Sequence, residues 1–196
     1  MVNNKIEIAG VIETGFMWDH DSGDECFYQF LLRIRRKNRD SDIIPVIISD
    51  KLIDVSTDMT GRSIFIDGEL RSFIHRDRNG SIRLFLYAFP QKASFLKRPA
   101  DINLIFLQGT VCQKPEYRRT PQGRWSTDVM LAVERGAALC DYIPCSGQNH
   151  QAGYLSVLPV GSRIRTIGSL QSRRYHENGR MNTGFELSLT SVESVV

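Results

Sequence analysis

The sequence predicts an all-β protein made of two tandem five-stranded barrels, and three observations lead to this prediction. First, residues 4–12 (NKIEIAGVI) return as residues 103–111 (NLIFLQGTV), shifted by 99 positions. Second, apolar and polar side chains alternate through most strong segments of both halves, which is the period of a strand. Third, each half has one short stretch that suits a helix, at the same place in the order of elements.

The repeat extends far beyond this segment, since Arg36 and Asp42 fall on Arg135 and Asp141 at the same shift. Its period exceeds the roughly 20 to 50 residues of repeat units that cannot fold alone. Each copy is therefore expected to be a domain with its own core. We expect a first domain at residues 1–95, more divergent than the second, a linker at 96–102 and a second domain at 103–196.

The expected strands of each copy bury one face. In the first copy the inward residues are Ile6, Ile8 and Gly10, then Phe30, Leu32 and Ile34, then Ile44, Val46 and Ile48, then Ile64, Ile66, Gly68 and Leu70. In the second copy they are Ile105, Leu107 and Gly109, then Val129, Leu131 and Val133, then Ile143 and Cys145, then Ile164, Thr166, Gly168 and Leu170. The parity is the same in both copies, which predicts matching core faces.

One short helix is expected between the third and fourth strands of each copy, at Asp50–Thr60 and at Asn149–Leu158. The Asn-Gly pairs at 79–80 and 178–179 are typical of tight hairpin turns. Three strands, a short helix and a hairpin form the plan of the OB barrel, which serves mainly to bind oligonucleotides and oligosaccharides. Glycines within strands fit the sharp bends of such a barrel.

Composition indicates a globular, weakly basic chain, with 41% hydrophobic residues and a formal net charge of +3. A phosphate-binding surface would need its cations gathered on one face, because affinity depends on local neutralisation. No apolar run reaches the roughly 18 residues of a membrane helix, and residues 1–5 lack the apolar stretch of a secretory signal. We therefore expect a cytoplasmic protein. The four cysteines offer no Cys-x-x-Cys pair, so reduced thiols are expected.

Several motifs of the second copy run in order along the chain: residues 103–109 (NLIFLQG), 115–123 (PEYRRTPQG), 131–135 (LAVER), 141–144 (DYIP) and 168–173 (GSLQSR). Together they resemble the bacterial single-stranded DNA-binding protein family. The first copy keeps less of the pattern, in residues 42–45 (DIIP) and 68–72 (GELRS).

This resemblance implies an OB fold, sequence-tolerant binding of single-stranded DNA, and an assembly that presents four OB domains. A chain with two domains would reach four as a homodimer. Two base-stacking positions of the family fall on Tyr142 and Tyr175. A third falls near Gln148, which cannot stack a base in the same way. The family's acidic C-terminal tail has no counterpart in residues 191–196, so recruitment of partner proteins by that route is not expected.

The candidate nucleic-acid-binding residues combine cations with rings, as unpaired strands require. They are Arg33, Arg35, Arg36, Lys37, Arg71, Phe73 and His75 in the first copy, and Arg118, Arg119, Arg124, Arg135, Tyr142, Arg173, Arg174 and Tyr175 in the second. The alternative for the basic run at 33–37 is a solvated strand edge guarded by charge. Trp18 and Trp125 stay open, because each could stack a base, cap its barrel or lie in a subunit contact.

Catalysis is not expected. The acidic group Asp19, Asp21, Asp24 and Glu25 around His20 reads as a solvated turn, and no counterpart exists in the second copy. The sequence has no phosphate-binding glycine loop, nucleophile elbow or zinc-protease motif, so no cofactor or metal is expected. The sequence favours a non-catalytic protein that coats single-stranded DNA in replication, repair, recombination or DNA transfer. The alternative is an OB-fold adaptor of a replication or restart complex with weak or no DNA binding.

Overall fold

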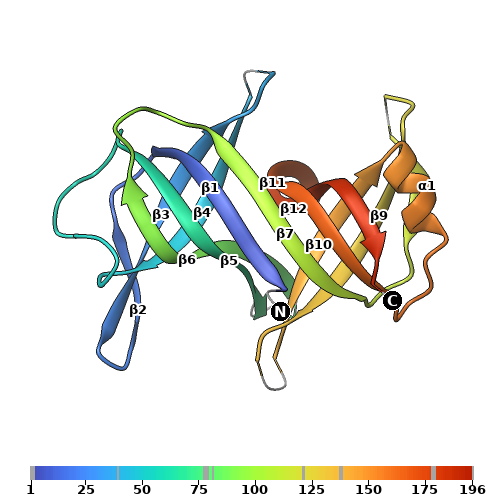
Figure 1. Ribbon diagram of the computed structural model, residues 1–196, viewed down its shortest axis with the longest axis horizontal. Coiled ribbons are helices and arrows are strands. Elements are labelled where there is room, and N and C mark those ends of the chain that lie inside the picture. The colour runs from blue at the N-terminus through green and yellow to red at the C-terminus, as the bar shows by residue number, and fades with distance from the viewer. Residues whose placement is uncertain are drawn as a thin grey trace. The chain divides into compact units, whose positions relative to one another are not determined.

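The computed structural model describes residues 3–38, 40–76, 80, 82–120, 122–136, 139–177 and 180–195. Over these residues the chain is mainly strand, with one helix (Figure 1). The strands of the first copy are β1 (Asn4–Ile12), β2 (Met17–Ser22), β3 (Glu25–Arg35), β4 (Ser41–Ser49), β5 (Ser63–Arg76) and β6 (Ile82–Phe95). The elements of the second copy are β7 (Ile102–Val111), β8 (Glu116–Arg119), β9 (Trp125–Glu134), β10 (Cys140–Gln148), α1 (His150–Ser156), β11 (Arg163–Glu177) and β12 (Arg180–Ser194).

The first copy is a closed barrel of five strands. β1 pairs antiparallel with both β3 and β5, and β3 pairs antiparallel with β4. β4 and β6 meet in parallel at Val46 and Ala88, and β6 neighbours β5, which completes the circle. β2 lies outside this circle as the first arm of a hairpin with β3.

The second copy repeats this plan strand for strand. β7 pairs antiparallel with β9 and β11, β9 with β10, and β11 with β12, while β10 and β12 pair in parallel around Cys145 and Leu187. β8 forms the outer hairpin with β9. The duplicated five-stranded barrel predicted from the alternating pattern is confirmed, and its connectivity is that of the OB fold.

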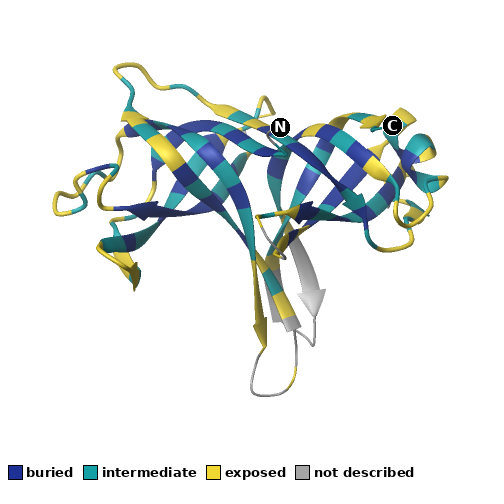
Figure 2. Cartoon of the chain, turned by 60° about the horizontal axis from the view of Figure 1, so that its bottom comes forward, coloured by how far each residue is buried: buried dark blue, intermediate teal, exposed yellow. Residues whose placement is uncertain are grey.

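The cores lie where the alternation placed them. Figure 2 shows buried residues alternating mainly with intermediate ones along the strands of each barrel. In the first barrel Ile6, Ile8 and Phe30 are at most 1% exposed, and in the second Leu107, Leu131 and Ile143 are fully buried. Burial at roughly 25 cal/mol per Å² of apolar surface makes these inward faces the main stabilising contribution of each barrel.

The four strand glycines that recur in both copies are needed for close backbone approach. A Cβ at Gly10 or Gly109 would collide with a carbonyl oxygen on the strand that closes the barrel, that of Arg33 or Ala132. Gly68 and Gly168 lie equally close to the hairpin partner strand, and the register shifts next to Gly168. The expectation of glycine at sharp barrel bends therefore has a steric cause.

The helix prediction holds for the second copy and is wrong for the first. α1 lies within the expected Asn149–Leu158 stretch. Residues 50–60 form turns instead, because Asp54 accepts hydrogen bonds from the backbone and side chain of Ser56, and Asp58 does the same for Thr60. These local bonds offer the backbone an alternative to the helical pattern.

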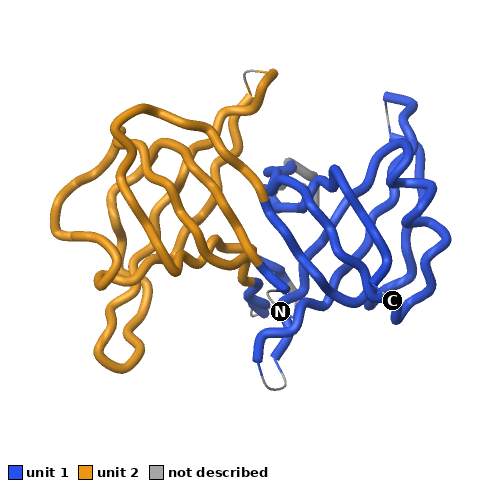
Figure 3. The backbone as a smooth tube through the Cα atoms, viewed as in Figure 1, with its two compact units in different colours: residues 1–4, 72–85, 105–196 blue, residues 5–71, 86–104 orange. Residues whose placement is uncertain are grey.

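The chain divides into two compact units that are not contiguous segments (Figure 3). One unit holds residues 5–71 and 86–104, and the other holds residues 1–4, 72–85 and 105–196. The distal part of the β5–β6 hairpin, residues 72–85, thus belongs with the second barrel although its sequence belongs to the first copy. We call this segment the hairpin arm. Within the described part of the chain, no helix has the length and apolar character needed to cross a membrane.

Candidate nucleic-acid interface

An exposed pair of stacked rings lies on the outer hairpin of the second barrel. Arg119 pairs with Trp125 across β8 and β9, and Tyr117 lies two residues before Arg119, so all three side chains lie on one face. The rings of Tyr117 and Trp125 are nearly parallel, at 8°, with centroids 4.7 Å apart. They are 48% and 46% exposed. The Arg119 guanidinium lies 5.7 Å from the centre of the Trp125 ring, so a cation flanks a flat aromatic surface.

The opposite face of the same hairpin carries an ion pair. Arg118 donates through Nε to Asp128 Oδ2 at 2.8 Å, and its Nη2 forms an ion pair with the same oxygen at 2.7 Å. Glu116 pairs with Asp128 across the strands, so its side chain lies on this face too. The expected DNA contact Arg118 is therefore paired with a carboxylate.

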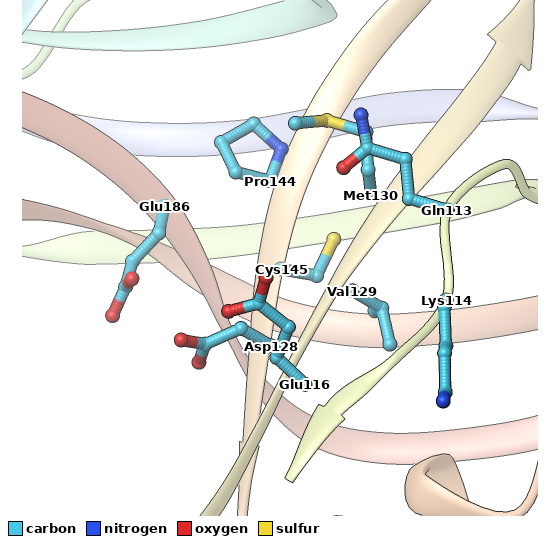
Figure 4. Close-up of a pocket in the computed structure, with 9 residues that line it drawn as sticks. All are labelled: Gln113, Lys114, Glu116, Asp128, Val129, Met130, Pro144, Cys145 and Glu186. Carbon is cyan, nitrogen blue, oxygen red and sulfur yellow. The ribbon is translucent and has the colours of Figure 1, made fainter. Parts of the chain in front are cut away.

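That carboxylate lines a pocket of about 220 Å³ (Figure 4). Its walls are Gln113, Lys114, Glu116, Asp128, Val129, Met130, Pro144, Cys145 and Glu186. Glu186 on β12 accepts a 2.7 Å hydrogen bond from Arg173, another expected DNA contact, and a 3.1 Å bond from the Ser146 hydroxyl. Two arginines on this side of the barrel are thus paired with carboxylates of the same pocket.

Cys145 lies at this pocket as a fully buried thiol. Burial raises its pKa well above the ordinary value for cysteine, and the nearby Glu186 charge acts in the same direction. A thiol in this state is protonated and poorly nucleophilic. The pocket therefore offers no activated cysteine, in agreement with a packing role for this residue.

A second, mainly apolar pocket of about 290 Å³ lies beside Tyr142. It is lined by Ile74 and Leu84 of the hairpin arm and by Gln113, Met130 and Tyr142 of the second barrel. Tyr142 is 39% exposed, so part of its ring is accessible. Gln113 and Met130 line both pockets, which makes the two hollows neighbours on one surface.

Two of the expected DNA contacts form the same internal ion pair in the two copies. Arg36 donates to both carboxylate oxygens of Asp42, whose side chain is 2% exposed, and this pairing raises the pKa of Arg36. Its counterpart Arg135 lies 3.6 Å from Asp141, whose side chain is 1% exposed. Their recurrence at equivalent positions has a structural reason, since each compensates a buried carboxylate. DNA contact by either arginine stays a prediction.

The remaining basic run of the first barrel is largely paired at the surface. Arg33 lies 2.6 Å from Glu13, and Arg35 lies 3.4 Å from Asp101. Lys37 is exposed in the turn after β3. Such exposed pairs contribute little to stability and can exchange partners, so they leave a phosphate role open.

The other expected residues of the first copy lie along β5. Arg71 pairs with Glu69 at 2.6 Å, and its guanidinium lies 5.3 Å from the ring centre of Phe89. Phe73 is 40% exposed, and His75 meets the edge of Phe85 at 6.5 Å between ring centres. Phe73 and His75 belong to the hairpin arm, whereas Arg71 does not.

In the second copy, Arg124 is exposed beside the turn between β8 and β9. The side chains of Arg174 and Tyr175 lie outside the described residues, although their backbone belongs to β11. The structure thus brings Arg118, Arg173 and Tyr142 to neighbouring hollows of one unit. The sequence left the role of Trp125 open, and the register of β8 on β9 is the signal that joins it to Tyr117.

The acidic residues in the turn of the first copy interact with different partners. Asp19 lies 2.6 Å from His20, Asp21 accepts a 3.0 Å bond from the Trp18 indole, and Asp24 lies 2.7 Å from Lys51. The bonds from Trp18 and from Lys51 lower the pKa of Asp21 and of Asp24, respectively. Among the residues that the structure describes, no cluster of histidine, cysteine or acidic side chains is arranged to hold a metal ion.

The chain has two closed five-stranded barrels with OB connectivity, and the second bears an exposed surface of rings and cations. These features define the class as a tandem OB-barrel protein. Residues 102–195 match the model of the single-strand binding protein family. The second barrel is therefore similar to that family, and the resemblance inferred from its motifs is confirmed.

Solved structures extend the likeness to the whole chain. The crystal structure of the wild-type single-stranded DNA-binding protein from Thermus aquaticus has a TM-score of 0.80 and 16% identity, and the match covers 98% of this chain and 93% of that one. A deletion mutant of the same protein gives a TM-score of 0.74 and 16% identity, with 98% of this chain and 94% of that one covered. At this identity the match establishes the tandem fold. A comparison with curated proteins found no match.

Proposed function

We propose that this chain is a non-catalytic protein that binds single-stranded DNA with little sequence preference and coats it in replication, repair, recombination or DNA transfer. The observation that carries the proposal is the exposed Tyr117–Trp125 stack, flanked by Arg119, on a barrel that matches the single-strand binding protein family. Unpaired bases expose flat faces, and an aromatic surface binds any of the four.

The surrounding charges suit the same ligand. Arg119 and Arg124 on the β8–β9 hairpin are exposed and could neutralise phosphates beside stacked bases. Each phosphate neutralised releases condensed counterions, so affinity falls as salt rises. Ring stacking contributes a term that depends little on salt. Binding should therefore weaken with salt without vanishing.

Titration of a labelled oligothymidine at two salt concentrations tests the proposal, with a duplex of equal length as the control. We expect micromolar or tighter binding of the single strand, weaker at the higher salt, and much weaker binding of the duplex. Absence of binding at low salt would contradict the proposal.

The adaptor alternative is favoured by one observation. Glu116, Asp128 and Glu186 line one pocket of the candidate interface, and the latter two hold Arg118 and Arg173. Carboxylates repel phosphates, so these three side chains would lower the affinity of the interface for DNA. The same titration separates the two functions, because an adaptor predicts no saturable binding of the oligothymidine at low salt.

We further propose a homodimer that presents four barrels to one strand, as the family resemblance implies. Several linked sites would raise avidity through effective concentration without any new contact. Light scattering tests this assembly: a solution mass near twice the 22.3 kDa of the chain is expected, and a mass equal to one chain would contradict it.

A further inference from the structure

Ser72 anchors the hairpin arm to the start of β10. Its backbone N–H donates to Asp141 Oδ1 at 2.7 Å, and its hydroxyl oxygen accepts the backbone N–H of Tyr142 at 2.8 Å. Asp141 is 1% exposed, so the bond to its carboxylate is charge-assisted and shielded from water. The two bonds run in opposite directions between the same neighbours, which fixes both the position and the register of the arm.

Ile74 follows Ser72 by two residues on β5 and so lies on the same side of the strand. It lines the apolar pocket together with Leu84 from β6 and with Met130 and Tyr142 of the barrel. Ile74 is 60% exposed and Tyr142 is 39% exposed, so the pocket is open to a ligand. The aromatic ring of Tyr142 and the aliphatic side chains of Ile74 and Leu84 line the same pocket, which we call the slot.

The chemistry of this slot suits an unpaired nucleobase. Tyr142 offers a ring for stacking, Ile74 and Leu84 offer apolar contact, and the Gln113 amide offers both a donor and an acceptor for a base edge. Gln113 and Met130 continue into the neighbouring pocket, where Lys114 supplies a cation for the attached phosphate. An apolar peptide side chain would use the aliphatic wall but would need neither the amide nor the adjoining cation.

We propose that this pocket is a composite base-binding site, in which the arm of the first copy supplies one wall to the second barrel. The inference rests on the proposed function and deepens it. If only Tyr142 contacted the base, the second barrel would bind it without help from the first copy. In the composite site, Ile74 and Leu84 of the hairpin arm also contact the base.

The test uses the full chain and the variants Ile74→Ala and Leu84→Ala, with Val160→Ala as the matched control. Val160 is an aliphatic residue of the same unit, 57% exposed, outside both pockets. Each variant is titrated with an oligothymidine and with an abasic strand of the same length and charge. Because Ile74 is largely exposed, its truncation leaves the barrel core intact, and the thermal midpoint of each variant verifies this.

We expect Ile74→Ala and Leu84→Ala to weaken oligothymidine binding about fivefold or more, with Val160→Ala close to wild type. On the abasic strand all four proteins should bind alike, because the pocket then has no base to receive. If wild type binds oligothymidine and the two pocket variants bind it equally well, the composite site is refuted and the proposed function stands. A loss that persists on the abasic strand also refutes a base pocket. If wild type fails to bind at all, both proposals fall.

Discussion

Arg118 donates a hydrogen bond of 2.8 Å from Nε to Asp128 Oδ2, and its Nη2 forms an ion pair of 2.7 Å with the same oxygen. A DNA phosphate that is to use this guanidinium must compete with a carboxylate already in place. The two groups are about one third exposed, so the pair is screened by water and open to exchange. Asp128 is thus expected to lower the affinity of the interface.

Asp128→Asn should tighten oligothymidine binding roughly threefold to tenfold at low salt, because Arg118 becomes available and a repulsive charge is removed. Glu193→Gln is the matched control. It removes the same charge from the same unit, but Glu193 pairs with Arg165 and lines neither pocket. An equal gain in both variants would show that net charge alone acts and would contradict a specific role for Asp128.

Trp125→Ala and Tyr117→Ala should each weaken single-strand binding by about 1 to 3 kcal/mol if bases stack on this pair. Trp125→Phe keeps a ring at this position, so its loss should be smaller. In a Trp18→Phe background the remaining tryptophan reports directly, and its fluorescence should change on titration with DNA. Unaltered affinity in both alanine variants would remove the ring pair from the interface.

Arg36→Ala should destabilise the first barrel by roughly 2 kcal/mol or more, because it leaves the buried Asp42 carboxylate without its guanidinium. Arg33→Ala is the contrast. Arg33 and Glu13 are both about 40% exposed, and such surface pairs contribute at most about 1 kcal/mol. Urea unfolding monitored by circular dichroism measures both variants. Equal stability losses would mean that the burial of Asp42 does not decide the cost.

The four cysteines should differ in their reaction with iodoacetamide. Cys140 is exposed and should be alkylated first, while Cys26 and Cys112 are half-buried thiols with raised pKa values and should follow more slowly. Cys145 should resist until the barrel unfolds, because its burial raises the pKa of the thiol and blocks access. Mass spectrometry of native and urea-treated protein measures the order. Early labelling of Cys145 would contradict the buried position.

The strands could be predicted because the alternating pattern recurs in both copies with the same parity. Ile64 and Ile66 alternate inward in the first copy, and the duplicated glycines lie where strands approach most closely. The helix predicted at residues 50–60 does not form, because the side chains of Asp54 and Asp58 accept hydrogen bonds from nearby backbone N–H groups. Such bonds compete with the helical hydrogen bonds, and the residue types alone do not show which set forms.

The candidate interface was only partly predictable. Arg36 and Arg135 recur for a reason internal to the barrel, so repetition alone could not separate a structural cation from a ligand contact. The stack of Tyr117 on Trp125 depends on the exact register of a hairpin, which the sequence left undetermined. The contact of Ser72 with Asp141 joins residues far apart in the chain, and no local pattern indicates it.

The membership of residues 72–85 in the second barrel's unit has an evolutionary consequence. Because residues 72–85 of the first copy belong to the unit of the second barrel, the two copies are not interchangeable modules. A recombination event at residues 96–102 would transplant the second barrel without Ser72, and the Asp141 carboxylate would lose the hydrogen bond from the Ser72 backbone N–H. A substitution at Ser72 in the first copy is therefore expected to alter the surroundings of Asp141 in the second.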